Sequence, residues 1–113
     1  MALLDEILEQ PKVIARLLTT SRPHIEAIAA KLADRELDFV YVIARGSSDN
    51  AGLYAKYLFG IENRLPTALA APSMFTSYAS APRLAKALTL AISQSGRSPD
   101  LLAAVVEARR QGS

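Results

Sequence analysis

The chain has 113 residues, of which half are hydrophobic, so it is long enough for one domain with a modest core. Its formal net charge is +2 and its basic and acidic residues are mixed along the sequence, so no basic stripe is available to bind nucleic acid. It has no cysteine and one histidine, His24, which argues against disulfides, zinc and a cysteine nucleophile, and we expect no metal or other cofactor.

The N-terminal part of the sequence predicts a lead of helices. Apolar residues recur at helical spacing over residues 3–18, with an interruption at Pro11. We predict a helix up to Pro11, a step there, and a second helix to about residue 19, because proline suits a first helical turn. Ser21 is predicted to cap a third helix that ends at the charged residues 34–36. The apolar stripe could pack on a sheet edge or pair with a second copy.

The targeting signals of exported or membrane proteins are missing from the sequence. No apolar run approaches the length that spans a bilayer. The first residues carry acids where a signal peptide carries bases. We therefore expect a cytoplasmic protein with no membrane partner.

Residues 39–44 are an unbroken run of β-branched and aromatic residues, which predicts a first, central strand. A turn of glycine and hydroxyl residues follows over residues 45–50, and a helical pattern then runs from 51 to 59. Arg45 could pair with a ligand phosphate, with Asp49 or with another acid. We interpret Asp49 as a first-turn residue that suits the helix dipole rather than as a general base.

Two further strands are predicted. Residues 65–70 indicate a short strand near an edge of the sheet, and residues 72–78 indicate one or two helical turns. Residues 88–92 are almost continuously apolar, which is typical of a strand buried on both faces. A polar turn over residues 93–98 follows this strand.

The last helix has clear start and stop signals. Ser98 is a suitable N-cap, Pro99 suits the first helical position, and Asp100 suits the positive end of the helix dipole. Residues 109–110 are arginines in the predicted last turn, and Gly112 is expected to end the helix.

Both polar turns have the composition of an anion-binding site. A helix N-terminus offers unpaired N–H groups and partial positive charge, and hydroxyls and amides add donors. Because the carboxyl ends of parallel strands share one edge, the two turns can hold one ligand. An ordinary strand-to-helix turn has the same composition, so both interpretations stay open. Neither a dinucleotide-binding fingerprint nor a P-loop is present.

The order of elements predicts an α/β fold: an incomplete three-layer α/β/α sandwich with a parallel sheet, preceded by a helical lead. We place the lead at residues 1–36. Residues 37–113 are expected to form the first part of a domain that is truncated before a fourth strand.

The two turns resemble those of the sugar isomerase (SIS) domain family. Residues 44–50 and 93–100 are most similar to stand-alone relatives of the isomerase half of glucosamine-6-phosphate synthase, the amino-sugar phosphate isomerase/deaminase group. The resemblance implies a phosphate-binding set of Ser93, Gln94, Ser95 and Ser98. It also implies a pocket lined by Gly46, Ser47 and Ser48. Arg97 stands where the synthase commonly has an acidic residue.

The resemblance implies that the chain binds a carbohydrate derivative, a hexose or amino-sugar phosphate. It would be a fragment of an isomerase, deaminase or aminotransferase-type enzyme acting on glucosamine 6-phosphate or fructose 6-phosphate. The family's general base and ring-opening groups match no residue of this chain, so binding without a catalytic residue is expected.

Two other functions fit the sequence less well. The alternative is a non-catalytic sugar-phosphate sensing module of a regulator. A serine hydrolase is disfavoured, because no Gly-x-Ser-x-Gly elbow is present. Exposed strand edges and the N-terminal apolar stripe also predict a homo-oligomer.

Overall fold

The computed structural model describes residues 2–45, 48–71, 75, 80–93 and 98–113. The chain divides into two compact units, Met1–Glu36 and Leu37–Ser113. Each unit is described by itself below.

The first unit consists of two helices, α1 (Ala2–Thr20) and α2 (Arg22–Ala33). The predicted step at Pro11 is wrong, since α1 runs through this proline. Proline removes one helical hydrogen bond but has a helical φ, so the turns on either side keep the helix together.

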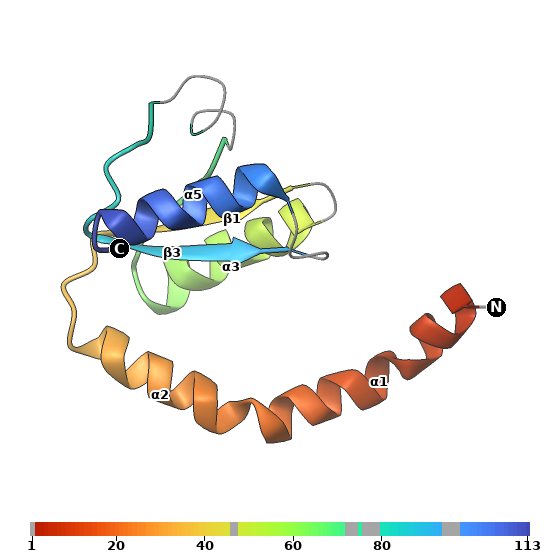
Figure 1. The fold of residues 1–113 in the computed structure, drawn as a ribbon. Helices are drawn as coiled ribbons and strands as arrows, with labels where there is room; N and C mark the ends of the chain where they lie inside the picture. The colour runs from red at the N-terminus through yellow and green to blue at the C-terminus, as the bar shows by residue number, and fades with distance from the viewer. Residues whose placement is uncertain (1, 46–47, 72–74, 76–79, 94–97) are drawn as a thin grey trace. The chain divides into compact units, whose positions relative to one another are not determined.

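The junction between α1 and α2 is itself helical. Ser21 has φ −92° and ψ −12°, and its side chain makes no cap hydrogen bond, contrary to the prediction. Its N–H donates to the Leu17 carbonyl at 3.0 Å, and its carbonyl accepts the Ile25 N–H at 2.9 Å. The helical hydrogen bonds therefore continue through the junction, and Figure 1 shows α2 extending from α1 in a shallow arc.

No residue of α1 or α2 is buried. Ten of their large apolar side chains are at least two-fifths exposed: Leu3, Leu4, Ile7, Leu8, Val13, Ile14, Leu17, Leu18, Ile25 and Ile28. Among the helices that the structure describes, none has the length and apolarity to cross a membrane.

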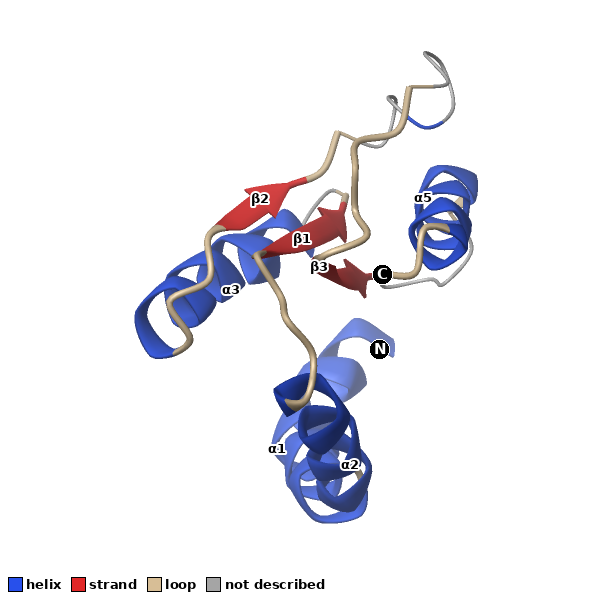
Figure 2. Cartoon of the chain, turned by 90° about the vertical axis from the view of Figure 1, so that its left-hand side faces the viewer, coloured by secondary structure: helices blue, strands red, loops and turns tan. Residues whose placement is uncertain are grey.

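The second unit is a parallel sheet between helices. Its elements are β1 (Phe39–Ala44), α3 (Ser48–Glu62), β2 (Thr67–Leu69), β3 (Ala87–Ile92) and α5 (Pro99–Arg110). The strand order is β2-β1-β3, so β1 is central, as predicted. Figure 2 shows α3 and α5 on opposite sides of the strands. The predicted incomplete α/β/α sandwich with a parallel sheet is confirmed.

The alternating side chains of β1 supply both cores. Val40 and Val42 pack with Ala55 of α3 on one face. Tyr41 and Ile43 pack with residues of α5 on the other face, among them Leu101 and Ala104. A strand that is covered on both faces needs a continuous apolar run, which explains the sequence of β1.

The other two strands differ in detail from the prediction. β2 is a short edge strand, as predicted, with three residues, and the carbonyl of Pro66 before it accepts the Val40 N–H at 2.8 Å. β3 is not buried on both faces: Ala87 is buried, but Ala91 is exposed. Within the described residues β3 pairs only with β1, so one of its sides lacks a neighbouring strand.

The helical turns predicted over residues 72–78 lie outside the described residues except at Phe75. That residue is helical, and its ring packs against Tyr41 with centroids 6.3 Å apart.

The C-terminal end of α5 is tied to the sheet. Gly112 has φ +91°, so it ends the helix as predicted, and its N–H donates to the Arg109 carbonyl at 3.0 Å. The Ser113 N–H donates to the Ala108 carbonyl at 3.0 Å, which completes a Schellman motif. The Ser113 hydroxyl also bonds to the Thr89 hydroxyl of β3 at 2.6 Å.

Candidate functional site

The carboxyl ends of β1 and β3 lie side by side at one edge of the sheet. The parallel register pairs Ala44 with Ile92, so Arg45 and Ser93 are the first residues beyond this edge. The chain then passes from β1 to α3 on one face and from β3 to α5 on the other. Open parallel sheets bind ligands at the carboxyl ends of the strands, at the point where successive connections go to opposite faces of the sheet.

Arg45 joins the starts of the two helices at this edge. Its guanidinium Nη1 donates to the Asp100 Oδ2 at 2.6 Å, across 55 residues of sequence. Its carbonyl accepts the Ser48 N–H at 3.3 Å. The open question of the Arg45 partner is thereby answered: in the described structure the side chain pairs with Asp100 and not with Asp49.

Three of the predicted site residues are described, and each is at this edge. Ser48 is the first residue of α3 and is half-buried. Ser93 directly follows β3 and is exposed. Ser98 precedes α5 with an extended backbone (φ −66°, ψ 120°) and is half-buried. Gly46, Ser47, Gln94 and Ser95, which were predicted with them, lie outside the described residues.

Ser98 occupies the N-cap position of α5, but its side chain makes no cap hydrogen bond, so the predicted capping role is wrong. The helix start is instead held by the Ser98 carbonyl, which accepts the Leu102 N–H at 3.0 Å. Pro99 occupies the helix start and Asp100 the first turn, as predicted. The Ser98 hydroxyl is therefore not engaged by its own helix.

Helix termini and side chains together determine the electrostatics of the edge. The positive ends of the α3 and α5 dipoles are both here. The described side chains add one cation, Arg45, and two first-turn carboxylates, Asp49 and Asp100. No group of three or more potential metal ligands occurs among the described residues. Such an edge suits an anion that is bound mainly by neutral N–H and O–H donors.

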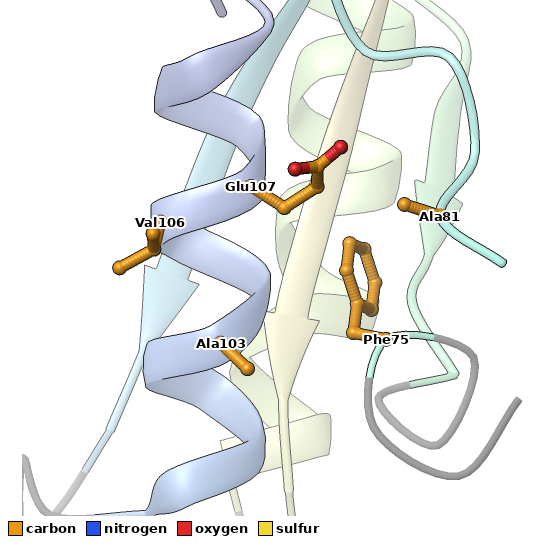
Figure 3. A pocket seen from close by; sticks show the side chains of 5 residues that line it. All are labelled: Phe75, Ala81, Ala103, Val106 and Glu107. Atoms are coloured by element: carbon orange, nitrogen blue, oxygen red, sulfur yellow. The ribbon is translucent and has the colours of Figure 1, made fainter. Parts of the chain in front are cut away.

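A hollow of about 500 Å³ elsewhere in the second unit has different chemistry. Figure 3 shows Glu107 and Ala103 of α5 across from Phe75 and Ala81. Among the described residues that line it, the one charged group is Glu107, which is paired with Arg110 at 2.6 Å, and the hydrogen bond from Arg110 lowers the pKa of this carboxyl. A mostly apolar hollow with a carboxylate does not suit a sugar phosphate.

From the sequence, Asp100 was interpreted only through the helix dipole, and its bond to Arg45 was not predicted. The relevant signal is the register of β1 on β3, which brings residues 45 and 100 to the same edge. No local pattern near either residue contains that register.

Comparisons with known proteins identify the class. No protein-family model matches the chain. It is 40% identical over 113 residues to a glutamine--fructose-6-phosphate aminotransferase (isomerizing) of Thermus thermophilus, covering 97% of the chain and 18% of that relative. The same enzyme of Streptomyces coelicolor is 37% identical over 118 residues, with 97% and 19% covered. The chain thus spans under a fifth of these curated relatives' length.

A solved structure extends the match. It is a protein from Silicibacter pomeroyi, described as a candidate phosphosugar isomerase, with a TM-score of 0.91 and 40% identity over 96% of this chain and 33% of that one. The fold and these matches confirm the resemblance to the sugar isomerase (SIS) domain family. More narrowly, the chain is a homologue of part of the isomerizing glutamine--fructose-6-phosphate aminotransferases.

Proposed function

We propose that this chain binds a hexose or amino-sugar phosphate at the edge formed by the carboxyl ends of β1 and β3. The observation that carries the proposal is the pair of helix N-termini, α3 and α5, that open from adjacent parallel strands at that edge. A phosphate placed between them gains N–H donors from both helices. The fructose 6-phosphate and phosphosugar in the names of its relatives match this ligand class.

Within this proposal the polar turns have separate roles. Ser93, Gln94, Ser95 and Ser98 hold the phosphate, and Gly46, Ser47 and Ser48 line the sugar pocket. The half-buried Ser48 and Ser98 support a ligand site between the two turns, because Ser48 begins α3, Ser98 precedes α5 and the Ser98 hydroxyl makes no cap bond. Hydroxyl donors suit phosphate oxygens without adding charge.

The chain would supply binding within a larger sugar-phosphate isomerase, deaminase or aminotransferase-type protein of the cytoplasm. Residues 37–113 would be the first part of its SIS domain and residues 1–36 a helical lead. We assign no catalytic residue to this chain. Chemistry on the bound sugar would come from groups elsewhere in that protein.

We also propose that the chain self-associates. The exposed apolar residues of α1 and α2 and the open side of β3 support this, since both kinds of surface favour pairing between chains. Size-exclusion chromatography with light scattering should give a mass above that of the 12.2 kDa monomer at micromolar concentration. A single monomeric species would refute self-association.

Calorimetric titration of the folded 113-residue chain tests the binding proposal. Glucosamine 6-phosphate or fructose 6-phosphate should bind, and glucosamine and fructose should not, because the phosphate supplies the recognised charge. A chain that melts cooperatively but binds none of these ligands would overturn the proposal for this chain.

Two variants locate the phosphate. Ser93→Ala combined with Ser95→Ala should weaken binding at least about tenfold, since each hydrogen bond to a charged group contributes about 1.5–3 kcal/mol. Asp49→Asn is the control and should have little effect. Equal losses in both variants would mean that the phosphate is bound at the other turn.

A further inference from the structure

Arg45 makes two contacts that reach two different helices. Its carbonyl accepts the Ser48 N–H of the first turn of α3 at 3.3 Å. Its Nη1 donates to the first-turn carboxylate of α5, Asp100, at 2.6 Å. One residue at the end of the central strand is therefore bonded to the starts of both helices that flank the candidate ligand site.

The charges of this pair argue against Arg45 as the main phosphate ligand. Asp100 is only 31% exposed, and its carboxylate lies in direct contact with the guanidinium. A phosphate approaching Arg45 would meet this carboxylate at close range. An arginine whose charge is already balanced by a carboxylate contributes more to positioning the elements that it joins than to attracting an anion.

The Arg45–Asp100 ion pair can control the position of the α5 N-terminus. The far end of α5 is held by the side chain of Gln111, which bonds to the Leu84 N–H at 2.7 Å, and by Ser113, which bonds to Thr89. At the near end, the ion pair itself connects α5 to the end of β1. With the C-terminal end anchored, loss of the pair leaves the N-terminal turn free to shift relative to α3.

We propose that Arg45 and Asp100 are a positioning pair that fixes the spacing between the N-termini of α3 and α5 for sugar-phosphate binding. The inference rests on the proposed function and goes beyond it by assigning these two residues a role. A phosphate that takes donors from both helices binds well only when the two sets of N–H groups are held at the right separation.

The Asp100→Asn variant separates positioning from direct charge recognition by the sign of its effect. Removing a carboxylate from an anion site raises anion affinity if Arg45 contacts the phosphate, because the guanidinium is released. The positioning role predicts the reverse, a loss of affinity for glucosamine 6-phosphate of about two- to fivefold, the range of an exposed ion pair. Calorimetry on the full chain measures it.

Variants of Arg45 complete a double-mutant cycle with Asp100→Asn. Arg45→Gln and the double variant with Asp100→Asn should each bind as weakly as Asp100→Asn alone, because one interaction is lost in all three. Arg45→Lys keeps a cation opposite Asp100 and should recover most of the affinity. Glu107→Gln is the matched control, since it breaks an ion pair of the same 2.6 Å length in α5 and should leave affinity unchanged.

Amide hydrogen exchange without ligand provides a second readout that does not depend on the proposed function. Two reporters bear on the helix starts: the Ser48 N–H, bonded to Arg45, and the Leu102 N–H, bonded to Ser98. Asp100→Asn should speed exchange at Ser48, in the other helix, and Arg45→Gln should speed exchange at Leu102. Glu107→Gln should change neither.

The outcomes are distinguishable. If the wild-type chain binds no sugar phosphate but exchange is coupled across the two helices, the proposed function fails and the structural coupling stands, without a ligand role. If the chain binds and Asp100→Asn leaves affinity unchanged or raises it, the positioning pair is refuted and the proposed function stands. Independent exchange at Ser48 and Leu102 also refutes the pair.

Discussion

Gln111 holds the backbone of Leu84 through its side chain. Its Oε1 accepts the Leu84 N–H at 2.7 Å, and its Nε2 donates to the Pro82 carbonyl at 3.0 Å. Leu84 is fully buried, so its N–H has no easy replacement partner in water. The amide thus joins the end of α5 to the segment that enters β3.

Gln111→Ala should therefore lower the free energy of unfolding by about 1–3 kcal/mol, the cost of leaving a buried donor unpaired. Urea denaturation followed by circular dichroism measures the change. Arg109→Gln, at an exposed position of the same helical turn, is the control and should have a small effect. Equal effects of the two substitutions would contradict a specific role of the amide.

Two glycines in α3 should respond to substitution in opposite directions. A Cβ at Gly52 would lie 3.2 Å from Val42 Cγ1, whereas nothing lies within 4 Å of a Cβ at Gly60. Gly52→Val should destabilise the fold by about 1–3 kcal/mol through overpacking against β1. Gly60→Ala should stabilise it by up to about 1 kcal/mol, because alanine favours helix. Thermal melts of both variants test the pair, and a stabilising Gly52→Val would refute the close packing.

Thr67 and Thr89 differ in whether their hydroxyls are bonded. The Thr67 Oγ1 is buried without a partner among the described residues, and the Thr89 Oγ1 bonds to Ser113 at 2.6 Å. Thr67→Val should leave stability unchanged or raise it by up to about 1 kcal/mol, since it removes an unsatisfied polar atom. Thr89→Val should lower stability by a similar amount. Chemical denaturation should show opposite signs, and a clear loss for Thr67→Val would indicate a partner for that hydroxyl.

Tyr41 should make the fold sensitive to alkaline pH. Burial raises the pKa of its phenol above the ordinary value of 10.0, because the fold disfavours the phenolate. The stabilising contribution of the neutral phenol is complete below the unfolded pKa, near 10, and is lost as the pH rises through the folded value. Tyr41→Phe should consequently lose less stability than the wild type above pH 10.

The measurement is the free energy of unfolding at pH 8 and above pH 10. Tyr54→Phe is the control for removing a phenol hydroxyl outside the core, because Tyr54 is 69% exposed. If the free energy of unfolding of Tyr41→Phe falls as steeply above pH 10 as that of the wild type, other groups cause the alkaline loss of stability.

The elements of the fold could be predicted where local chemistry decides them. The β-branched run of β1, the Pro99 start of α5 and the Gly112 stop each act within a few residues, and each prediction is confirmed. The step at Pro11 was wrong because the helix tolerates one missing hydrogen bond. The full burial of β3 was wrong because burial depends on how many strands pair with it.

The candidate site could be predicted only in part, because some of its contacts depend on how distant segments pair. The serine-rich turns and their place after strands are visible in the sequence, and their roles remain predictions. The Arg45–Asp100 pair depends on strand register over 55 residues, which no local pattern encodes. Residue propensity correctly predicted Ser98 at the N-cap position of α5, but the side chain does not make the expected cap hydrogen bond.

β1 contributes alternate side chains to both cores, which has a consequence for the kinetics of folding. Phe39 pairs with Ala87, so a segment of about fifty residues must bring its two ends together before β3 can align with β1. Pairing so distant in sequence is slow, and both helical layers depend on it. The second unit should therefore gain its two cores in one concerted step, with a transition state in which β1 and β3 are already aligned.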